Sequence, residues 1–508
     1  MRRAGTLYCP AVRDIVIPKR NGHGQSRPDA VVVGSGPNGL SAALVLAGAG
    51  YGVRIYEAEV EPGGGLRTAE LTRPGFRHDV CSAIHPMAAA SPFFRSLPLA
   101  EHGLEWIQPD APLAHPLPDG GVVLLERSID ATAHGLGPDG DAWRSLVEPF
   151  VEGWPKIVGS VLGPPVRPPR HPLAMARFGR LALRSAEAVG RRFRGERAAA
   201  LWAGLAAHSM TALDRPLTAG IGLVLSVIAH LEGWPFPRGG SDRLAQAMIS
   251  ILSERGGEIV TGRRIESLDD LPPAGATLLD VTPRQLLRIA GERLPPGYRR
   301  ALARFRYGPA AYKVDWALDG PIPWQADECG RAGTVHVGGT AEEIRAGEGL
   351  VDRGGHPDRP FVLLAQPTLF DPDRAPAGKH VAWAYCHVPN GSTVDMTEAI
   401  ERQVERFAPG FGERILARHV MGPAALEAHN ANLVGGHVNG GLQDLRQTFA
   451  RPVLRLDPYA TPLAGLYLCS SSTPPGGGVH GMCGYHAARS ALRGALRGRK
   501  TRATFTAS

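Results

Sequence analysis

The chain has 508 residues, of which 43% are hydrophobic and 20% are charged, and its 64 glycines and 45 prolines make up about a fifth of it. A chain of this length and composition folds into two or three domains with sizeable hydrophobic cores. These figures exclude a collagen-like fibre, a disordered chain and a small disulfide-stapled protein.

The formal net charge of +8 comes from the two ends of the chain. Residues 1–28 have six basic side chains and one acidic one, and residues 489–508 have six basic ones and no acid. Because these ends together carry +11, the residues between them carry −3. We therefore expect no nucleic-acid partner. The basic tails, 1–28 and 498–508, are interpreted as solvated ends, and peripheral contact with a membrane stays open.

The six cysteines are scattered without any C-x-x-C pair, which argues against a zinc site or a redox-active dithiol and is typical of a reducing compartment. No apolar stretch follows the N-terminal arginines as in a secretory signal. The longest apolar run, 219–229, is shorter than the roughly 18–20 residues that span a bilayer. We expect a soluble, cytoplasmic protein with no metal site.

The first strong motif begins at Asp29, where an apolar strand is expected to end in the turn Gly34-Ser-Gly-Pro-Asn-Gly39. A helix of mostly small residues follows over 40–47. This arrangement binds the pyrophosphate of a dinucleotide. Gly34 permits the tight turn, Gly36 lets the backbone approach the phosphates, and Gly39 lets the helix pack close to the sheet.

The start of the predicted helix and the end of the next strand supply further groups for the dinucleotide, one set for its phosphates and one for its ribose. Pro37 and Asn38 stand at the helix N-terminus, where free N–H groups and the positive end of the dipole face the phosphates. Glu57 ends the strand predicted over 53–56. Its carboxylate can accept hydrogen bonds from a ribose 2′-OH, and it would repel a phosphate on that oxygen.

A second glycine-rich segment, Pro62-Gly-Gly-Gly-Leu-Arg-Thr68, follows directly, and then comes Pro74-Gly-Phe-Arg-His-Asp79. With the first motif, these segments resemble the glutathione-reductase-like flavoproteins of the phytoene dehydrogenase and amine oxidase type. More narrowly, they resemble the phytoene dehydrogenase-related oxidoreductases. The resemblance implies that the dinucleotide is FAD and that four residues of this segment belong to its site: Gly64, Gly65, Leu66 and Arg67. Many relatives have an arginine directly after the glycine pair, where this chain has Gly65, with Arg67 two positions later.

Two later segments extend the resemblance. Gly233-Trp-Pro-Phe-Pro-Arg-Gly-Gly-Ser241 precedes an amphipathic helix over 244–251 and a strand near Ile265, which matches the adenine-contacting position of the family. Near the C-terminus, a strand over 465–472, a glycine-rich loop and a helix match the segment beside the flavin ring. The resemblance places Gly478, Val479 and Met482 at the flavin.

These segments predict an α/β fold with a discontinuous, Rossmann-like, glutathione-reductase-like FAD-binding domain. Residues 29–100, 235–285 and 455–497 form this domain. The stretches between them, 101–234 and 286–454, form an α+β substrate domain with a mixed sheet, because the first stretch is helical in pattern and the second alternates like strands. The apolar run 219–229 is interpreted as a buried core helix.

Lys313 is the candidate catalytic residue that the strand pattern favours. In the alternating segment 311–318, Lys313 and Asp315 take one face, and Lys313 is the one lysine outside the tails that lies within a predicted strand. The resemblance implies a role like that of the amine oxidase lysine that holds a water near flavin N5. A lysine there can keep its charge to stabilise reduced flavin or lose it and act as a base. Carotene desaturases typically lack this lysine.

His387, at the end of a predicted strand, is the second candidate catalytic residue, and His85 is a weaker one. Together these features predict an FAD-dependent oxidoreductase: an oxidase, desaturase or dehydrogenase that moves a hydride between a C–H bond and flavin N5. The substrate is expected to be apolar and small to medium in size, and the electron acceptor is dioxygen or a quinone. Two other functions stay open: a flavin-dependent isomerase without net redox change, and a regulatory protein that FAD stabilises. The oligomeric state is not predicted.

Overall fold

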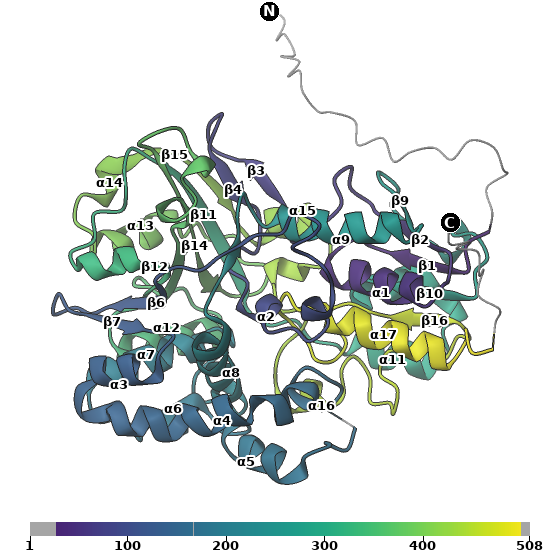
Figure 1. Cartoon of the computed structure of the whole chain (residues 1–508), viewed down its shortest axis with the longest axis horizontal. Coiled ribbons are helices and arrows are strands. Elements are labelled where there is room, and N and C mark those ends of the chain that lie inside the picture. Colours follow the sequence, from purple (N-terminus) through teal and green to yellow (C-terminus); the bar gives the residue numbers. More distant parts are fainter. Residues whose placement is uncertain (1–26, 166, 499–508) are drawn as a thin grey trace, which may run out of the picture.

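The protein is described here by a computed structural model that covers residues 27–165 and 167–498. Its two large sheets lie in two lobes side by side, the five-stranded sheet on the right of Figure 1 and the seven-stranded sheet on the left. The charge predictions for the two basic tails fall largely outside the described residues. The chain passes repeatedly between the lobes, as the discontinuous domain predicted from the sequence requires.

The five-stranded sheet is parallel throughout, with the order β16-β10-β1-β2-β9. Its strands come from three distant parts of the chain, so the segments predicted to form a Rossmann-like domain meet in one sheet. They are β1 (Ala30–Val33), β2 (Val53–Tyr56), β9 (Glu258–Val260), β10 (Ala276–Leu279) and β16 (Leu466–Leu468). The predicted fold class is confirmed by this sheet and by the mixed sheet of the other lobe.

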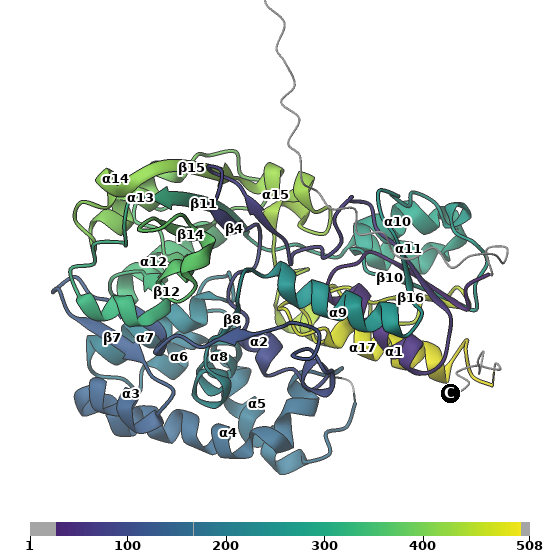
Figure 2. The same cartoon turned by 45° about the horizontal axis from the view of Figure 1, so that its top comes forward.

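Helices cover both faces of the parallel sheet. On one face lie α1 (Pro37–Gly48), α9 (Asp242–Glu254) and α17 (Met482–Arg493), whose apolar residues share a core with Val32 and Ile55. On the other lie α10 (Pro283–Ala290) and α11 (Pro296–Ala303), which pack on Val31 and Leu279 (Figure 2). The predicted domain boundary at residue 285 stays a prediction, and this packing favours a boundary near residue 303.

Small residues let α1 lie unusually close to its neighbours. A Cβ on Gly39 would lie 2.0 Å from the carbonyl oxygen of Gly34, and one on Gly484 would lie 1.8 Å from the carbonyl oxygen of Asn38. Both contacts are with backbone, which cannot rotate away. The glycine at position 39 is therefore required for the helix to begin where it does, as the sequence predicts.

The seven-stranded sheet has the order β15-β11-β14-β13-β12-β6-β7 and is antiparallel except for the parallel pair β12–β6. One face packs on α13 (Thr397–Glu405) and α14 (Phe411–Arg414), around Trp316. The strands are β6 (Ala111–Pro116), β7 (Val122–Leu125), β11 (Ala310–Leu318), β12 (Ala332–Val337), β13 (Val362–Ala365), β14 (His380–Val388) and β15 (Ile415–Met421).

A layer of helices covers the other face and shares one core with Leu113 and Leu363. Its members are α3 (Ile129–Gly135), α4 (Gly140–Val161), α5 (Pro172–Ala182), α6 (Ala186–Gly190), α7 (Glu196–Ala207), α8 (Thr218–Glu232) and α12 (Ala341–Asp352). The apolar run 219–229 lies in α8 and is mostly buried, which confirms the interpretation as a core helix. Among the helices that the structure describes, none is long and apolar enough to cross a membrane.

Short elements complete the fold. The two-stranded sheets pair β3 (Thr68–Glu70) with β4 (Arg77–Asp79) and β5 (Trp106–Ile107) with β8 (Phe236–Pro237). The short helices are α2 (Pro86–Ala89), α15 (Pro423–His429) and α16 (Leu445–Phe449).

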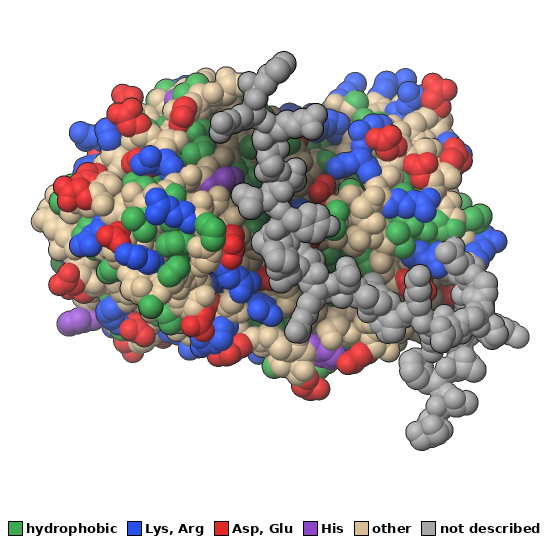
Figure 3. Space-filling view, turned by 90° about the horizontal axis from the view of Figure 1, so that it is seen from above, with side chains coloured by type: hydrophobic (Ala, Val, Ile, Leu, Met, Phe, Trp, Pro, Cys, Tyr) green, Lys and Arg blue, Asp and Glu red, His purple; other side chains and the backbone are tan. Residues whose placement is uncertain are grey.

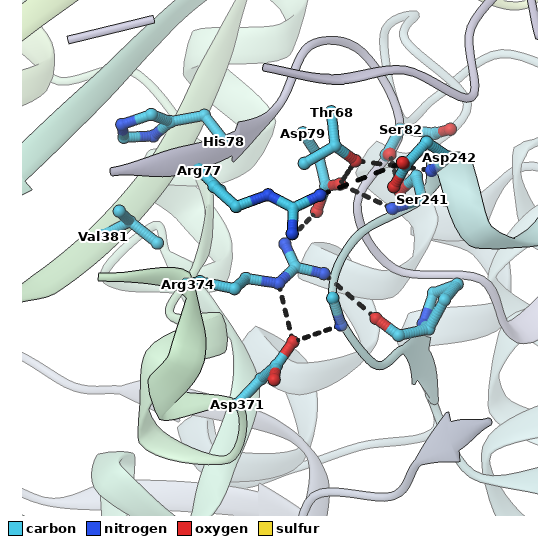
Figure 4. Close-up of polar contacts among 12 residues, drawn as sticks. Thr68, Arg77, His78, Asp79, Ser82, Ser241, Asp242, Asp371, Arg374 and Val381 are labelled. Atoms are coloured by element: carbon cyan, nitrogen blue, oxygen red, sulfur yellow. Dashed lines mark hydrogen bonds and ion pairs between the residues drawn. The ribbon is translucent and has the colours of Figure 1, made fainter. Parts of the chain in front are cut away.

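A buried ion-pair network centred on Arg374 joins the lobes (Figure 4). The Arg374 guanidinium, 1% exposed, donates to the carboxylates of Asp79 at 2.6 Å and Asp371 at 2.9 Å, and to the carbonyl oxygen of Pro237. The other carboxylate oxygen of Asp79 accepts from the backbone N–H of Ser241. Arg374 and Asp371 lie in the segment predicted to form the substrate domain. Asp79 and Ser241 lie in segments predicted to form the FAD-binding domain.

Candidate active site

A cavity of about 1080 Å³ lies between the lobes. Seen from above, the surface is hollowed between them (Figure 3). The cavity is lined by the glycine turn after β1, the loop before α17, one face of β11–β14, and residues of α5 and α8. It therefore connects the predicted dinucleotide site with the seven-stranded sheet.

Two glycine turns form the floor of one end of the cavity. Gly34 has φ +95° and Gly64 has φ +59°, both in the left-handed region that favours glycine. A Cβ on Gly64 would lie 2.8 Å from the Cα of Gly36, so the backbones of the two turns are in direct contact. The resulting cradle of bare backbone at the N-terminus of α1 has the form of a pyrophosphate site.

Glu57 stands at the end of β2, beside this cradle, and is 6% exposed. Its carboxylate accepts from the backbone N–H of Ser35 at 2.8 Å and from that of Glu59 at 3.0 Å. The Arg67 guanidinium lies 3.9 Å from it, and the Arg67 Nε finds no hydrogen-bond partner among the described residues. Glu57 is thus fixed facing the cavity, and a buried arginine donor beside it is available to a ligand.

Asp280 is a carboxylate of this site that the sequence analysis missed. It follows β10 directly, lines the cavity and accepts from the backbone N–H of Gly39 at 2.9 Å. Burial raises the pKa of Asp280 to about 7, the Gly39 N–H opposes this rise, and the negative charge of Glu57 adds to it. An ionisable acid therefore stands at the N-terminus of α1, where phosphates are expected.

Lys313 reaches the same cavity from β11 and is 3% exposed. Its ammonium forms an ion pair with Asp315, which is fully buried, and lies 5.7 Å from the centre of the Trp383 ring. His78 is 3.7 Å from the same carboxylate, but burial lowers the pKa of His78 to about 4. The Lys313 ammonium is the closest cationic group to Asp315, and His419 also lies 3.7 Å from this carboxylate.

The structure brings most of the predicted site residues to this cavity. Those that line it are Gly34, Gly36, Pro37, Asn38, Glu57, Gly64, Gly65, Arg67, Ile265, Lys313, Gly478 and Val479. Gly39, Leu66 and Met482 lie behind the lining: Leu66 is fully buried, and Met482 is the first residue of α17. Direct contacts to FAD stay a prediction for all of these residues.

His387 is not brought to the cavity, contrary to the role predicted for it. It lies opposite Ala311 in the β11–β14 pair, is 1% exposed, and its Nδ1 is within 2.9 Å of both carboxylate oxygens of Glu348. Its ring packs against Phe361 and Tyr385 behind the lining. His85 does line the cavity, but its Nε2 is hydrogen-bonded to Ser241, so it positions the chain that returns to α9.

Several lining residues were missed because single positions in strands and loops show no pattern. The missed residues on the seven-stranded sheet are Thr334, Leu363, Trp383 and Tyr385, and those from the helical layer are His208, Ser209 and Trp234. The alternation of strand 380–388 could have placed Trp383 and Tyr385 on one face, but the cavity-facing side could not be chosen without the partner strands.

Fold and site together define a class: a two-lobed oxidoreductase that binds a dinucleotide at a Rossmann-like sheet and places a second lobe over it. Residues 38–493 match the family described as flavin containing amine oxidoreductase, and the chain belongs to this family. It is an FAD-dependent oxidoreductase. The orphaned donor of Arg67, the unpartnered side-chain oxygen of Asn38 and the glycine cradle all fit a bound FAD.

Individual relatives agree with this family. The chain is 27% identical to the mouse pyridine nucleotide-disulfide oxidoreductase domain-containing protein 2, over 93% of this chain and 94% of that protein. It is 27% identical to a phytoene dehydrogenase of Streptomyces griseus, over 71% and 73%. Among solved structures, it resembles an oxidoreductase of Methanosarcina mazei (TM-score 0.59, 16% identity, 91% of this chain and 99% of that one). A putrescine oxidase has a TM-score of 0.58 at 16% identity, covering 93% and 98%.

We expect Asp280 to make FAD binding pH-dependent. Because its folded pKa of about 7 lies above its ordinary 3.8, it already lowers the stability of the protein as pH rises from about 4 to about 7. A pyrophosphate beside it would raise this pKa further, so that FAD binds together with a proton. We expect FAD affinity to fall about tenfold between about pH 6 and about pH 9.

Fluorescence titration of FAD against pH measures this effect. Asp280→Asn keeps an acceptor for the Gly39 N–H and has no titrating proton, so its FAD affinity should be flat over the same range. An equal slope in the variant would assign the pH dependence to another group.

Proposed function

We propose that the protein transfers a hydride between a C–H bond of an elongated, largely apolar substrate and FAD, with dioxygen or a quinone as the electron acceptor. The observation that carries the proposal is the position of Lys313. It lies in the same cavity as the glycine cradle and the loop of Gly478 and Val479, although it comes from the other lobe. Bound FAD supplies the hydride-accepting N5, and the protein supplies the arrangement around it.

The apolar walls of the cavity that Lys313 lines support an apolar substrate. They include Ile84 and Met87 from the loop and helix α2, Ile221 and Val224 from α8, and Leu363 from β13. Such walls exclude water from the reacting carbon, and exclusion of water strengthens every electrostatic contact at the site. The phenol of Tyr385, directly opposite Lys313 in the β11–β14 pair, adds a polar edge.

The loop before α17 supports a second role. Gly478 and Val479 line the cavity, and α17 begins at Met482 after the left-handed Gly481. A helix of twelve residues carries a partial positive charge at its N-terminus. We infer that this end and the Lys313 ammonium together stabilise negative charge on the reduced cofactor.

Lys313→Met tests this electrostatic role without a known substrate. Removing the ammonium leaves the buried Asp315 carboxylate unbalanced near the reduced cofactor, so reduction becomes less favourable. We expect the midpoint potential of bound FAD to fall by several tens of mV, since about 30 mV corresponds to 1.4 kcal/mol for two electrons. Spectroelectrochemical titration of the FAD-loaded protein measures it.

The chain offers a matched control in Lys379. It also forms an ion pair, with Asp319, but both side chains are more than a third exposed and neither lines the cavity. Lys379→Met should leave the potential unchanged. If Lys313→Met also leaves it unchanged, Lys313 does not lie near the cofactor and the proposed arrangement is wrong.

A further inference from the structure

Three buried hydrogen-bonding groups line the cavity near His208 and His336, and we call them the head pocket: Trp234, which packs on both histidines, Ser209, which follows His208, and Thr334, two residues before His336. Their side chains are 4%, 2% and 5% exposed, and all three line the cavity. The two hydroxyl oxygens and the indole nitrogen have no hydrogen-bond partner among the described residues. A buried polar group without a partner is destabilising by about 1–3 kcal/mol, so three together point to a ligand.

The head pocket is separated from Lys313 by three strand spacings of the seven-stranded sheet. In register, Lys313 lies opposite Tyr385, Tyr385 opposite Leu363, and Leu363 opposite His336. Thr334, two residues before His336 on β12, faces the same side. Three strand spacings make about 14 Å, since neighbouring strands lie about 4.8 Å apart. A ligand that reaches both ends is therefore elongated.

The hydrogen-bonding chemistry of the three groups favours a ligand atom that accepts hydrogen bonds. An indole N–H can only donate, and each hydroxyl can donate as well as accept. A ligand oxygen with two lone pairs can take hydrogen bonds from two or three of them at once. A protonated amine could not be bound by the indole, because it has no lone pair to offer.

The residues around the head pocket favour a neutral ligand oxygen over the charged oxygen of a carboxylate. The Trp234 ring packs against His208 and His336, at centroid distances of 5.7 and 5.9 Å. These two histidines are joined by a hydrogen bond of 2.9 Å between their Nε2 atoms, and burial lowers the pKa of His208 to about 3. Both are neutral at physiological pH, so they provide no positive charge for a carboxylate, which is costly to bury unpaired.

We infer that the substrate is an elongated apolar molecule with a neutral oxygen, a carbonyl or hydroxyl, at one end, and that Ser209, Trp234 and Thr334 bind this oxygen. The inference rests on the proposed function and names the substrate class of the same cavity. It places the reacting carbon about 14 Å from the oxygen, near Lys313.

Calorimetric titration with three probes of matched chain length tests the inference: methyl octyl ketone, decylamine and decanoate. The FAD-loaded wild-type protein should bind the ketone at least tenfold more tightly than either charged probe. Ser209→Ala/Thr334→Val removes both hydroxyls while nearly preserving shape, and it should weaken ketone binding at least tenfold. Trp234→Phe removes the indole donor together with part of the ring and should weaken ketone binding in the same direction. It replaces the double variant in the test if that variant does not fold.

Ser226→Ala is the matched control, because Ser226 is also fully buried but donates to the carbonyl oxygen of Gly222 within α8. It should bind the ketone as the wild type does. Equal ketone affinity in wild type and head-pocket variants would mean that the three groups hold only water, and tightest binding of decylamine would assign the cavity to amines. Either result overturns the inference. A protein that takes up no FAD would instead refute the proposed function, and absorbance of the loaded sample reports that separately.

Discussion

Arg374→Met is expected to lower the free energy of unfolding by about 3–5 kcal/mol. Arg374 is 1% exposed, and its guanidinium balances Asp79 and Asp371, which are themselves buried. The substitution keeps an apolar chain of similar length but leaves two carboxylates in a site closed to water. The midpoint and slope of urea unfolding, followed by far-UV circular dichroism, measure the loss.

The pH dependence of this loss identifies its cause. Burial by itself would raise the pKa of Asp79, but the charge and the hydrogen bond of Arg374, together with hydrogen bonds from Ser241 and Thr68, hold this pKa below its ordinary value of 3.8. A depressed carboxyl pKa gives stability that is present above the unfolded pKa and is lost as pH falls through the folded one. The difference between wild type and variant should therefore shrink as pH is lowered below about 4.

Arg402→Met is the matched control for Arg374. Arg402 pairs with Glu398 one helical turn away, and both side chains are largely exposed. Exposed pairs of this kind contribute about 0.3–0.5 kcal/mol, so the control should unfold nearly as the wild type does. Losses of equal size in the two variants would show that the network in Figure 4 does not hold the lobes together.

Gly39→Ala is expected to abolish FAD binding. The added Cβ would lie 2.0 Å from the Gly34 carbonyl oxygen, and 3.3 Å from the Asp280 carboxylate. Because the clash is with backbone, α1 must move away from β1, which opens the cradle and shifts the N–H groups that face the phosphates. We expect FAD affinity to fall at least a hundredfold, measured by quenching of flavin fluorescence.

Gly159→Ala gives the comparison for this substitution. Gly159 lies in α4, and a Cβ there meets nothing within 4 Å. Alanine is favoured over glycine inside a helix by about 0.5–1 kcal/mol, so this variant should be slightly more stable and bind FAD normally. Normal FAD binding by Gly39→Ala would show that the cofactor lies elsewhere.

The dinucleotide half of the site could be predicted from the sequence because its chemistry is local. Gly34, Gly36 and Gly39 stand within six residues, and Glu57 ends the next strand, so strand, turn and helix determine their positions together. The resemblance to flavoproteins then joined this segment to Ile265 and Gly478, which are far away in the chain. The structure places all three segments at one cavity.

The other half depends on contacts that no local pattern contains. Asp79 and Arg374 are 295 positions apart, and Asp280 meets Gly39 across 241 positions. The head pocket needs the order of four strands, which brings β12 within reach of a cavity that begins at β1. The sequence predicts a catalytic role for His387 at the end of a strand, whereas the fold places its imidazole against the carboxylate of Glu348 in α12, behind the cavity lining.

The absorption spectrum of the purified protein under anaerobic conditions tests the central claim most directly. We expect a yellow protein with one FAD per chain, whose flavin absorption bleaches when an elongated substrate with a neutral terminal oxygen is added. The absorption should return when dioxygen or a quinone is added. A folded, colourless protein that takes up no added FAD would contradict it.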